Sequence, residues 1–211
     1  MSRLPQTSSR PSGKKLSDTL AALQAAHPSA QVQIWAQDEA RLGLQPIIRR
    51  VWTRHKHRPL ARCSYKRKWL YLYAFVHPES GQTEWLILPR VRTDVMSLVL
   101  AEFACLVGAG ATKQIVLVLD NAGWHTSTDL VIPEGIHLEF LPSHTPELQP
   151  AERLWPLVRE SLANTSFADL DALEARLVER CQKLTPQREM VGKLTYYHWW
   201  PRDESGLSSQ I

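Results

Sequence analysis

The spacing of hydrophobic residues along the chain predicts a mixture of strands and helices. Residues 32–38 alternate between apolar and polar with period two, and several short runs are rich in β-branched or aromatic side chains. Both patterns are typical of strands. The predicted strands cover 32–38, 49–53, 69–76, 83–88, 115–119 and 136–141. Helical spacing predicts helices over 16–26, 94–107 and 170–184, and a further helix starts near Pro150.

The order of these elements predicts an α/β fold. The early strands form an antiparallel meander, a helix follows, and a further strand pair and two helices close the chain, which predicts a mixed β-sheet flanked by helices on both faces. The helix over 94–107 is apolar almost all round and is expected to be buried. We expect a flexible basic segment at 1–30 with a short helix, a catalytic domain at 31–185, and an aromatic-rich tail at 186–211.

Composition narrows the class of protein. The chain has 211 residues, of which 44% are hydrophobic and 22% charged, as in a globular domain with one core. The first thirty residues hold no apolar core like that of a secretory signal, and no run approaches the roughly 18 apolar residues that cross a membrane. Three widely spaced cysteines do not suggest a disulfide framework. A cytoplasmic protein without a membrane partner is the expectation.

Positive charge is concentrated in one segment. Between Arg49 and Lys68 there are nine Lys or Arg residues and no acid, although the net charge of the whole chain is only +4. This pattern predicts contact with a polyanion such as DNA, and the alternative is a solvated hairpin. The nine cations are Arg49, Arg50, Arg54, Lys56, Arg58, Arg62, Lys66, Arg67 and Lys68.

Three carboxylates stand at the ends of predicted elements. Asp38 ends the alternating stretch, Asp120 follows the apolar run 115–119, and Glu152 follows a proline-rich loop. Carboxylates beside low-dielectric protein repel one another, and a shared divalent cation relieves that repulsion. Each also has a simpler explanation: a solvated strand end for Asp38, turn chemistry for Asp120, and complementing a helix dipole for Glu152. Together they predict a magnesium site for phosphate chemistry.

The segments around these carboxylates resemble the three catalytic blocks of a known family. Residues 35–43, 119–125 and 140–155 are similar to those of DDE transposases, more narrowly the bacterial insertion-sequence branch of the mariner-like superfamily. The resemblance implies a ribonuclease H-like fold and DNA strand cleavage and strand transfer at transposon ends. It maps the catalytic residues onto Asp38, Asp120 and Glu152, with two Mg²⁺ or Mn²⁺ ions held between them. Asn121 and His125 are accessory candidates, and His125 could instead be structural.

The resemblance has two departures. Gln149 stands where the family commonly has asparagine. Family members also carry helix-turn-helix modules ahead of the catalytic domain, so we expect either a separate polypeptide with that module or a truncated remnant. A dimer on DNA is implied by the family. The rival hypotheses are an inactive DNA-binding relic and a ribonuclease H-type nuclease for RNA:DNA hybrids.

Overall fold

A computed structural model describes residues 13–57, 65–143 and 145–201. Five strands form one sheet in the order β3-β2-β1-β4-β5. The first three strands along the chain make the antiparallel part, and β4 and β5 continue the sheet in parallel with β1. The predicted mixed sheet with its meander is confirmed. The strands are β1 (Gln31–Gly43), β2 (Trp69–His77), β3 (Gln82–Leu88), β4 (Lys113–Leu119) and β5 (Ile136–Phe140).

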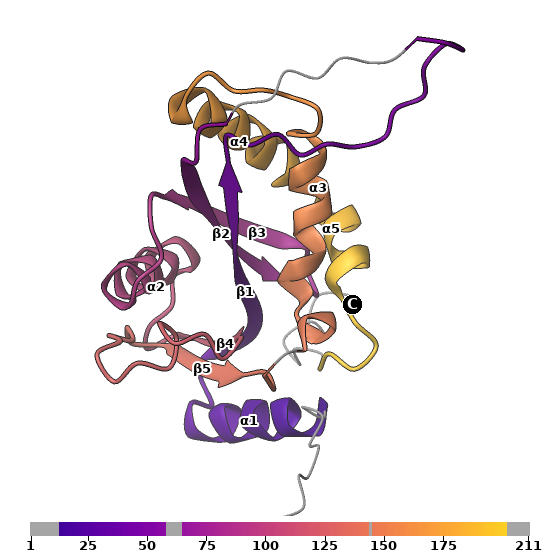
Figure 1. The fold of residues 1–211 in the computed structure, drawn as a ribbon. Coiled ribbons are helices and arrows are strands. Elements are labelled where there is room, and N and C mark those ends of the chain that lie inside the picture. Colours follow the sequence, from indigo (N-terminus) through magenta and orange to yellow (C-terminus); the bar gives the residue numbers. More distant parts are fainter. Residues whose placement is uncertain (1–12, 58–64, 144, 202–211) are drawn as a thin grey trace, which may run out of the picture.

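Helices cover both faces of this sheet (Figure 1). Helix α2 packs on one face through residues such as Leu100 and Phe103, which meet Trp35 and Phe75 of the sheet. On the other face lie α3, α4 and α5, while α1 contributes Leu16 and Leu20 at one end. The helices are α1 (Gly13–Ala26), α2 (Thr93–Val107), α3 (Leu154–Glu160), α4 (Leu170–Leu184) and α5 (Arg188–Thr195), with 3₁₀ turns η1 (Pro146–Leu148) and η2 (Pro150–Arg153).

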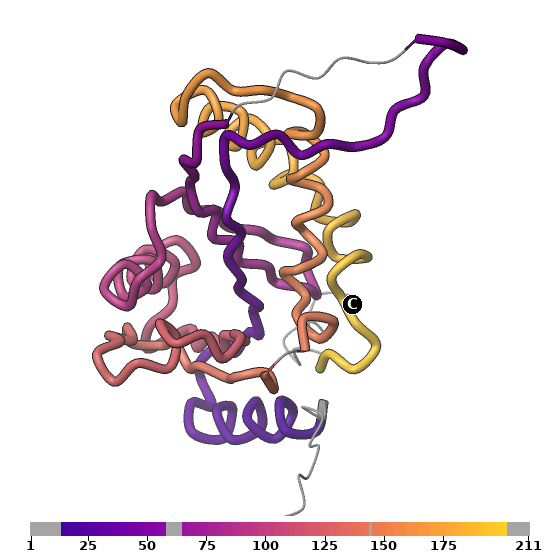
Figure 2. The backbone as a smooth tube through the Cα atoms, viewed as in Figure 1, coloured from indigo at the N-terminus to yellow at the C-terminus, as the bar shows by residue number. Residues whose placement is uncertain are grey.

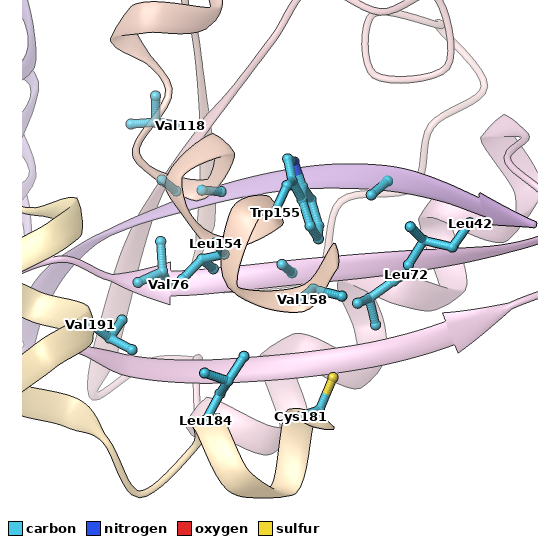
Figure 3. Close-up of a cluster of buried hydrophobic side chains, with 14 of the residues drawn as sticks. Leu42, Leu72, Val76, Val118, Leu154, Trp155, Val158, Cys181, Leu184 and Val191 are labelled. Carbon is cyan, nitrogen blue, oxygen red and sulfur yellow. The ribbon is translucent and has the colours of Figure 1, made fainter. Parts of the chain in front are cut away.

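Helix α3 lies at the centre of the core between the sheet and helices α3, α4 and α5. Leu154, Trp155 and Val158 point from it toward the strands, beside Leu184 of α4 and Val191 of α5 (Figure 3). Pro156 lies in the first turn of α3, where a backbone nitrogen needs no helical partner. The helical stretch changes from 3₁₀ to α just before that proline. This buried, short helix fixes the position of the residues that precede it.

Two sequence predictions were wrong in detail. No strand forms over 49–53: those residues are exposed, and no strand in the described parts of the chain pairs with them. β-branched residues make a strand only when they pair and pack. Helix α2 is also not buried all round, since Leu98 is 71% exposed on its outer side. The spacing of apolar residues in the sequence could not show that α2 packs against the sheet with one side and leaves its outer side exposed.

The connection between β1 and β2 is a long arm. We call residues 44–68 the arm. In its described part, 44–57 leave the body of the molecule near α3 and α4 and extend well beyond it, and 65–68 lie beside the body near α4 (Figure 2). The arm carries the basic segment predicted from the sequence. None of the helices in the described parts of the chain is both long and apolar enough to cross a membrane.

Candidate active site

The sheet register brings the first two predicted carboxylates together. Strands β1 and β4 are parallel neighbours, and Ala36 pairs with Val118, so two residues further along Asp38 lies beside the position of Asp120. Asp38 shares its face of β1 with Ile34 and Ala36, which belong to the core under α3. The alternation seen in the sequence therefore directs this carboxylate toward α3.

The third carboxylate, that of Glu152, lies in the 3₁₀ turn η2, just before α3. Asp38, Asp120 and Glu152 line the same pocket, of about 350 Å³. Asn121 and Gln149 also line it, and the side-chain amide of each donates a hydrogen bond to a backbone carbonyl. The Asn121 amide donates to the Leu141 carbonyl, and Gln149 Nε2 donates to the Gln37 carbonyl at 2.9 Å. All three predicted catalytic carboxylates thus face one cavity.

Burial disfavours the ionised form of two of these carboxylates. Removal from water, with repulsion from Glu152 and Glu39, raises the pKa of Asp38 to about 7, although a 2.7 Å bond from Trp155 Nε1 opposes the rise. Burial likewise raises the pKa of Glu152; the Arg159 charge opposes this rise and the Asp120 charge adds to it. The pocket therefore holds carboxylates whose ionised forms a cation would favour.

Asp120 behaves differently because His125 holds it. His125 Nδ1 lies 2.8 Å from Asp120 Oδ1, and the Ala122 amide donates to the same oxygen at 3.0 Å. The bond from His125 lowers the pKa of Asp120 despite partial burial. This aspartate is accordingly ionised and oriented by its own loop.

A neighbouring acid that the sequence analysis did not single out completes this arrangement. Glu39 Oε1 lies 2.9 Å from His125 Nε2 and accepts a bond from Trp124 Nε1 at 3.2 Å. Burial alone would lower the pKa of His125, but its bonds to Asp120 and Glu39 raise that pKa to about 9. The buried imidazolium donates to both acids. The signal in the sequence was the pair of acids at 38 and 39, which period two places on opposite faces of β1.

The donor set suits a hard divalent cation, because carboxylate oxygens are the ligands that Mg²⁺ and Mn²⁺ prefer. Within residues 13–57, 65–143 and 145–201, however, no three His, Cys, Asp or Glu side chains stand close enough together to form a ready-made metal site. The three carboxylates share a cavity without converging on one point.

The predicted DNA-binding cations are only partly described. Arg49, Arg50, Arg54 and Lys56 are exposed on the outgoing limb of the arm, and Lys66 to Lys68 on its return. Arg58 and Arg62 lie outside the described residues. The arm is thus separate from the carboxylate pocket but joins β1 five residues after Asp38.

Solved structures show which class of fold this is. The mariner Mos1 paired end complex with Mg matches with a TM-score of 0.51 and 16% identity, covering 93% of this chain and 66% of that one. The Mos1 mariner paired end complex with Mn matches with a TM-score of 0.51 and 14% identity, covering 93% and 65%. The fold is ribonuclease H-like. The chain spans about two thirds of the length of these Mos1 chains.

Sequence comparison gives the family. The family described as DDE superfamily endonuclease matches residues 33–174, so this chain belongs to the DDE superfamily endonucleases. An uncharacterized protein of Sinorhizobium fredii, y4pE/y4sA, is 36% identical over 132 residues, which cover 62% of this chain and 96% of the relative. The resemblance found from the three sequence blocks is confirmed at the level of this family.

Proposed function

We propose that this protein is the catalytic domain of a DDE transposase, which cleaves and joins DNA strands at the ends of an insertion sequence. The observation that carries the proposal is that Asp38, Asp120 and Glu152 line one pocket in a chain of the DDE endonuclease family. Intact acids at all three positions favour this function over an inactive relic.

In this proposal the three carboxylates would hold two Mg²⁺ or Mn²⁺ ions. When bound, the metal activates a water or a 3′-hydroxyl and stabilises the leaving oxygen. The chain's own residues supply the orientation. Trp155 fixes one oxygen of Asp38, and His125 with the Ala122 amide fixes one oxygen of Asp120. Both bonds to Asp120 reach Oδ1, which would leave Oδ2 for a metal ion.

The proposed partner is DNA, contacted by the exposed cations of the arm. The matched Mos1 structures are described as paired end complexes. By analogy we propose that this chain acts as a dimer on DNA, together with a helix-turn-helix module on a separate polypeptide.

Replacing Asp120 with Asn tests the catalytic assignment. The introduced amide would keep an oxygen that can accept from His125 but lacks the charge that holds a cation. Nicking of a supercoiled plasmid with Mn²⁺ is therefore expected to fall by at least about 100-fold. Calorimetric titration of Mn²⁺ should show weaker binding in parallel. RNA:DNA hybrid and duplex DNA are compared as substrates.

The matched control is Asp129→Asn, which neutralises an exposed acid outside the carboxylate pocket and should leave nicking and Mn²⁺ binding unchanged. Nicking that persists in Asp120→Asn contradicts the assignment. Cleavage confined to the RNA strand of the hybrid would instead identify a ribonuclease H-type nuclease.

A further inference from the structure

A second cavity, larger than the carboxylate pocket, lies at the root of the arm. We call it the arm-root groove; it measures about 620 Å³ and is bounded by the end of β1, the two limbs of the arm and the segment between α3 and α4. Five of its lining residues are cations, and among the lining residues that the structure describes none is acidic. The cations are Arg41, Lys66, Arg67, Lys68 and Arg159.

The walls of this groove are held by specific bonds. On the outgoing limb, Ile47 forms a bridge with Ala163, and its carbonyl accepts from the Asn164 amide at 2.8 Å. Asn164 has a φ of +57°, a conformation that asparagine tolerates better than most residues, and its side chain accepts from the Arg49 amide at 2.9 Å. The arm is therefore fixed at its root even though it extends from the body.

The return limb is fixed as well. Lys66 Nζ donates to the Ala168 carbonyl at 3.0 Å, and the Leu44 amide donates to the Lys68 carbonyl at 3.0 Å. Both limbs are thus tied to the body on either side of the groove. The cavity is a built feature and not a gap beneath a loose loop.

One wall offers a flat stacking surface. The guanidinium carbon of Arg41 lies 5.1 Å from the centre of the Trp69 ring, and Trp69 remains 40% exposed. Aromatic rings and guanidinium planes are the surfaces on which unpaired bases stack. A paired base inside a duplex does not offer its face in this way. Cations with a stacking surface therefore favour a single strand over a duplex.

Two segments of the chain run from the carboxylate pocket to the groove. In β1, Arg41 follows Asp38 by three residues, and this odd spacing places the two side chains on opposite faces of the sheet. Along η2 and α3, Arg159 follows Glu152 by seven residues, roughly 11 Å or close to three nucleotide steps, and its charge acts on the Glu152 pKa. A DNA strand that leaves the carboxylate pocket along α3 would therefore reach the groove at Arg159.

We propose that the arm-root groove binds an unpaired segment of the DNA strand, with a base stacked on Trp69 and Arg41 and phosphates on Lys68 and Arg159. The placement of this segment, with Arg159 about three nucleotides from the reacting phosphate, rests on the proposed function. The binding itself does not, because the groove has its own residues and needs no metal.

Fluorescence anisotropy of the full chain in EDTA tests this. The probes are a labelled oligothymidylate and a labelled blunt duplex. Trp69→Ala is expected to raise the Kd for oligothymidylate about 10-fold, as loss of one stacked base should, and the Kd for duplex by less than about 2-fold. Trp69→Phe should restore most of the affinity. Arg159→Gln should reduce the salt slope for the single strand by about 0.7.

The control is Arg176→Gln, which removes an exposed cation of α4 outside the groove and should change neither Kd. Unchanged affinity for oligothymidylate in both Trp69→Ala and Arg159→Gln overturns the proposal. Equal losses for single strand and duplex overturn it too, since they indicate a duplex phosphate contact. The same two Kd values are also measured for Asp120→Asn. This variant is expected to lose nicking but to keep both Kd values, so the two proposals are tested separately.

Discussion

Asp38 is the residue at which folding and proposed chemistry oppose each other most directly. Its carboxylate lies between the core and the pocket, bonded to the indole of Trp155. Burial and the neighbouring acids raise its pKa to about 7, so in the absence of a cation its charge works against the fold. Residues that are costly for stability and retained at a pocket are typical of functional sites.

The first stability prediction follows from this raised pKa. An unfolded Asp38 ionises near 3.8 and the folded one near 7, so the folded state binds the proton more tightly and stability falls as pH rises between these values. Asp38→Asn removes this penalty while keeping an acceptor for Trp155. Its melting temperature without metal should exceed that of the wild type by several degrees above pH 7, since about 1 kcal/mol gives roughly 2–4 °C.

The difference should shrink as pH falls from 7 toward 4, where the folded wild-type carboxyl is already neutral. Differential scanning calorimetry across this range measures it. A constant difference at all pH values would mean that titration of Asp38 is not its source. Asp129→Asn, at an exposed acid, is the matched control and should show no difference.

At the scale of elements, the turn between β2 and β3 is tied closely to α5. Gly81 has a φ of +67°, and a Cβ at this position would stand 1.8 Å from the carbonyl oxygen of Arg188 at the start of α5. Glycine is required here both for the backbone conformation and for the close approach. This turn thus serves as a contact surface for a helix far along the chain.

Gly81→Ala is therefore expected to destabilise the protein by more than about 2 kcal/mol, because strain and overlap act together. Chemical denaturation monitored by circular dichroism measures the loss. Gly108→Ala separates the two causes: Gly108 has a φ of +69° but no atom near its Cβ direction, so only the smaller strain of about 1 kcal/mol is expected. Equal losses in both variants would show that the contact with α5 contributes nothing.

At the scale of the whole molecule, the carboxylates and the cations of the arm occupy separate regions. The carboxylates lie in β1, just after β4 and in η2, whereas the outgoing limb of the arm extends away from the body (Figure 1). Anionic DNA is attracted by the arm and repelled by a carboxylate pocket without a cation. In the proposed function, binding of DNA and cleavage of DNA thus belong to different parts of the chain.

Neutralising the outgoing limb should weaken binding to any duplex. The triple variant Arg50→Gln, Arg54→Gln and Lys56→Gln is expected to reduce the slope of log K against log salt by up to about three, at roughly 0.9 per phosphate contact. The control variant changes Arg176, Lys183 and Lys193, whose partners are acids on α4 and α5, and alters the net charge equally. Equal slopes for both variants would contradict a role of the arm in binding.

Local patterns in the sequence determined much of this protein. Period two placed Asp38 on the face of the small apolar residues, and the apolar run before Asp120 correctly predicted a strand, which lies between β1 and β5 in the sheet. These signals depend on neighbouring residues alone, because side chains alternate along a strand and buried strands are apolar. The three motif blocks likewise sufficed to recognise the family. The catalytic roles themselves stay predictions.

Tertiary structure decided what depends on residues far apart. Glu39 meets His125 across 86 positions, and the arm is fixed by Asn164, 115 positions from Arg49. The arm-root groove joins Arg41 to Arg159. None of these pairs has a periodic signal, since they arise from strand register and helix packing and not from local conformation. Local sequence determined the elements and their chemistry, and packing selected which side chains work together.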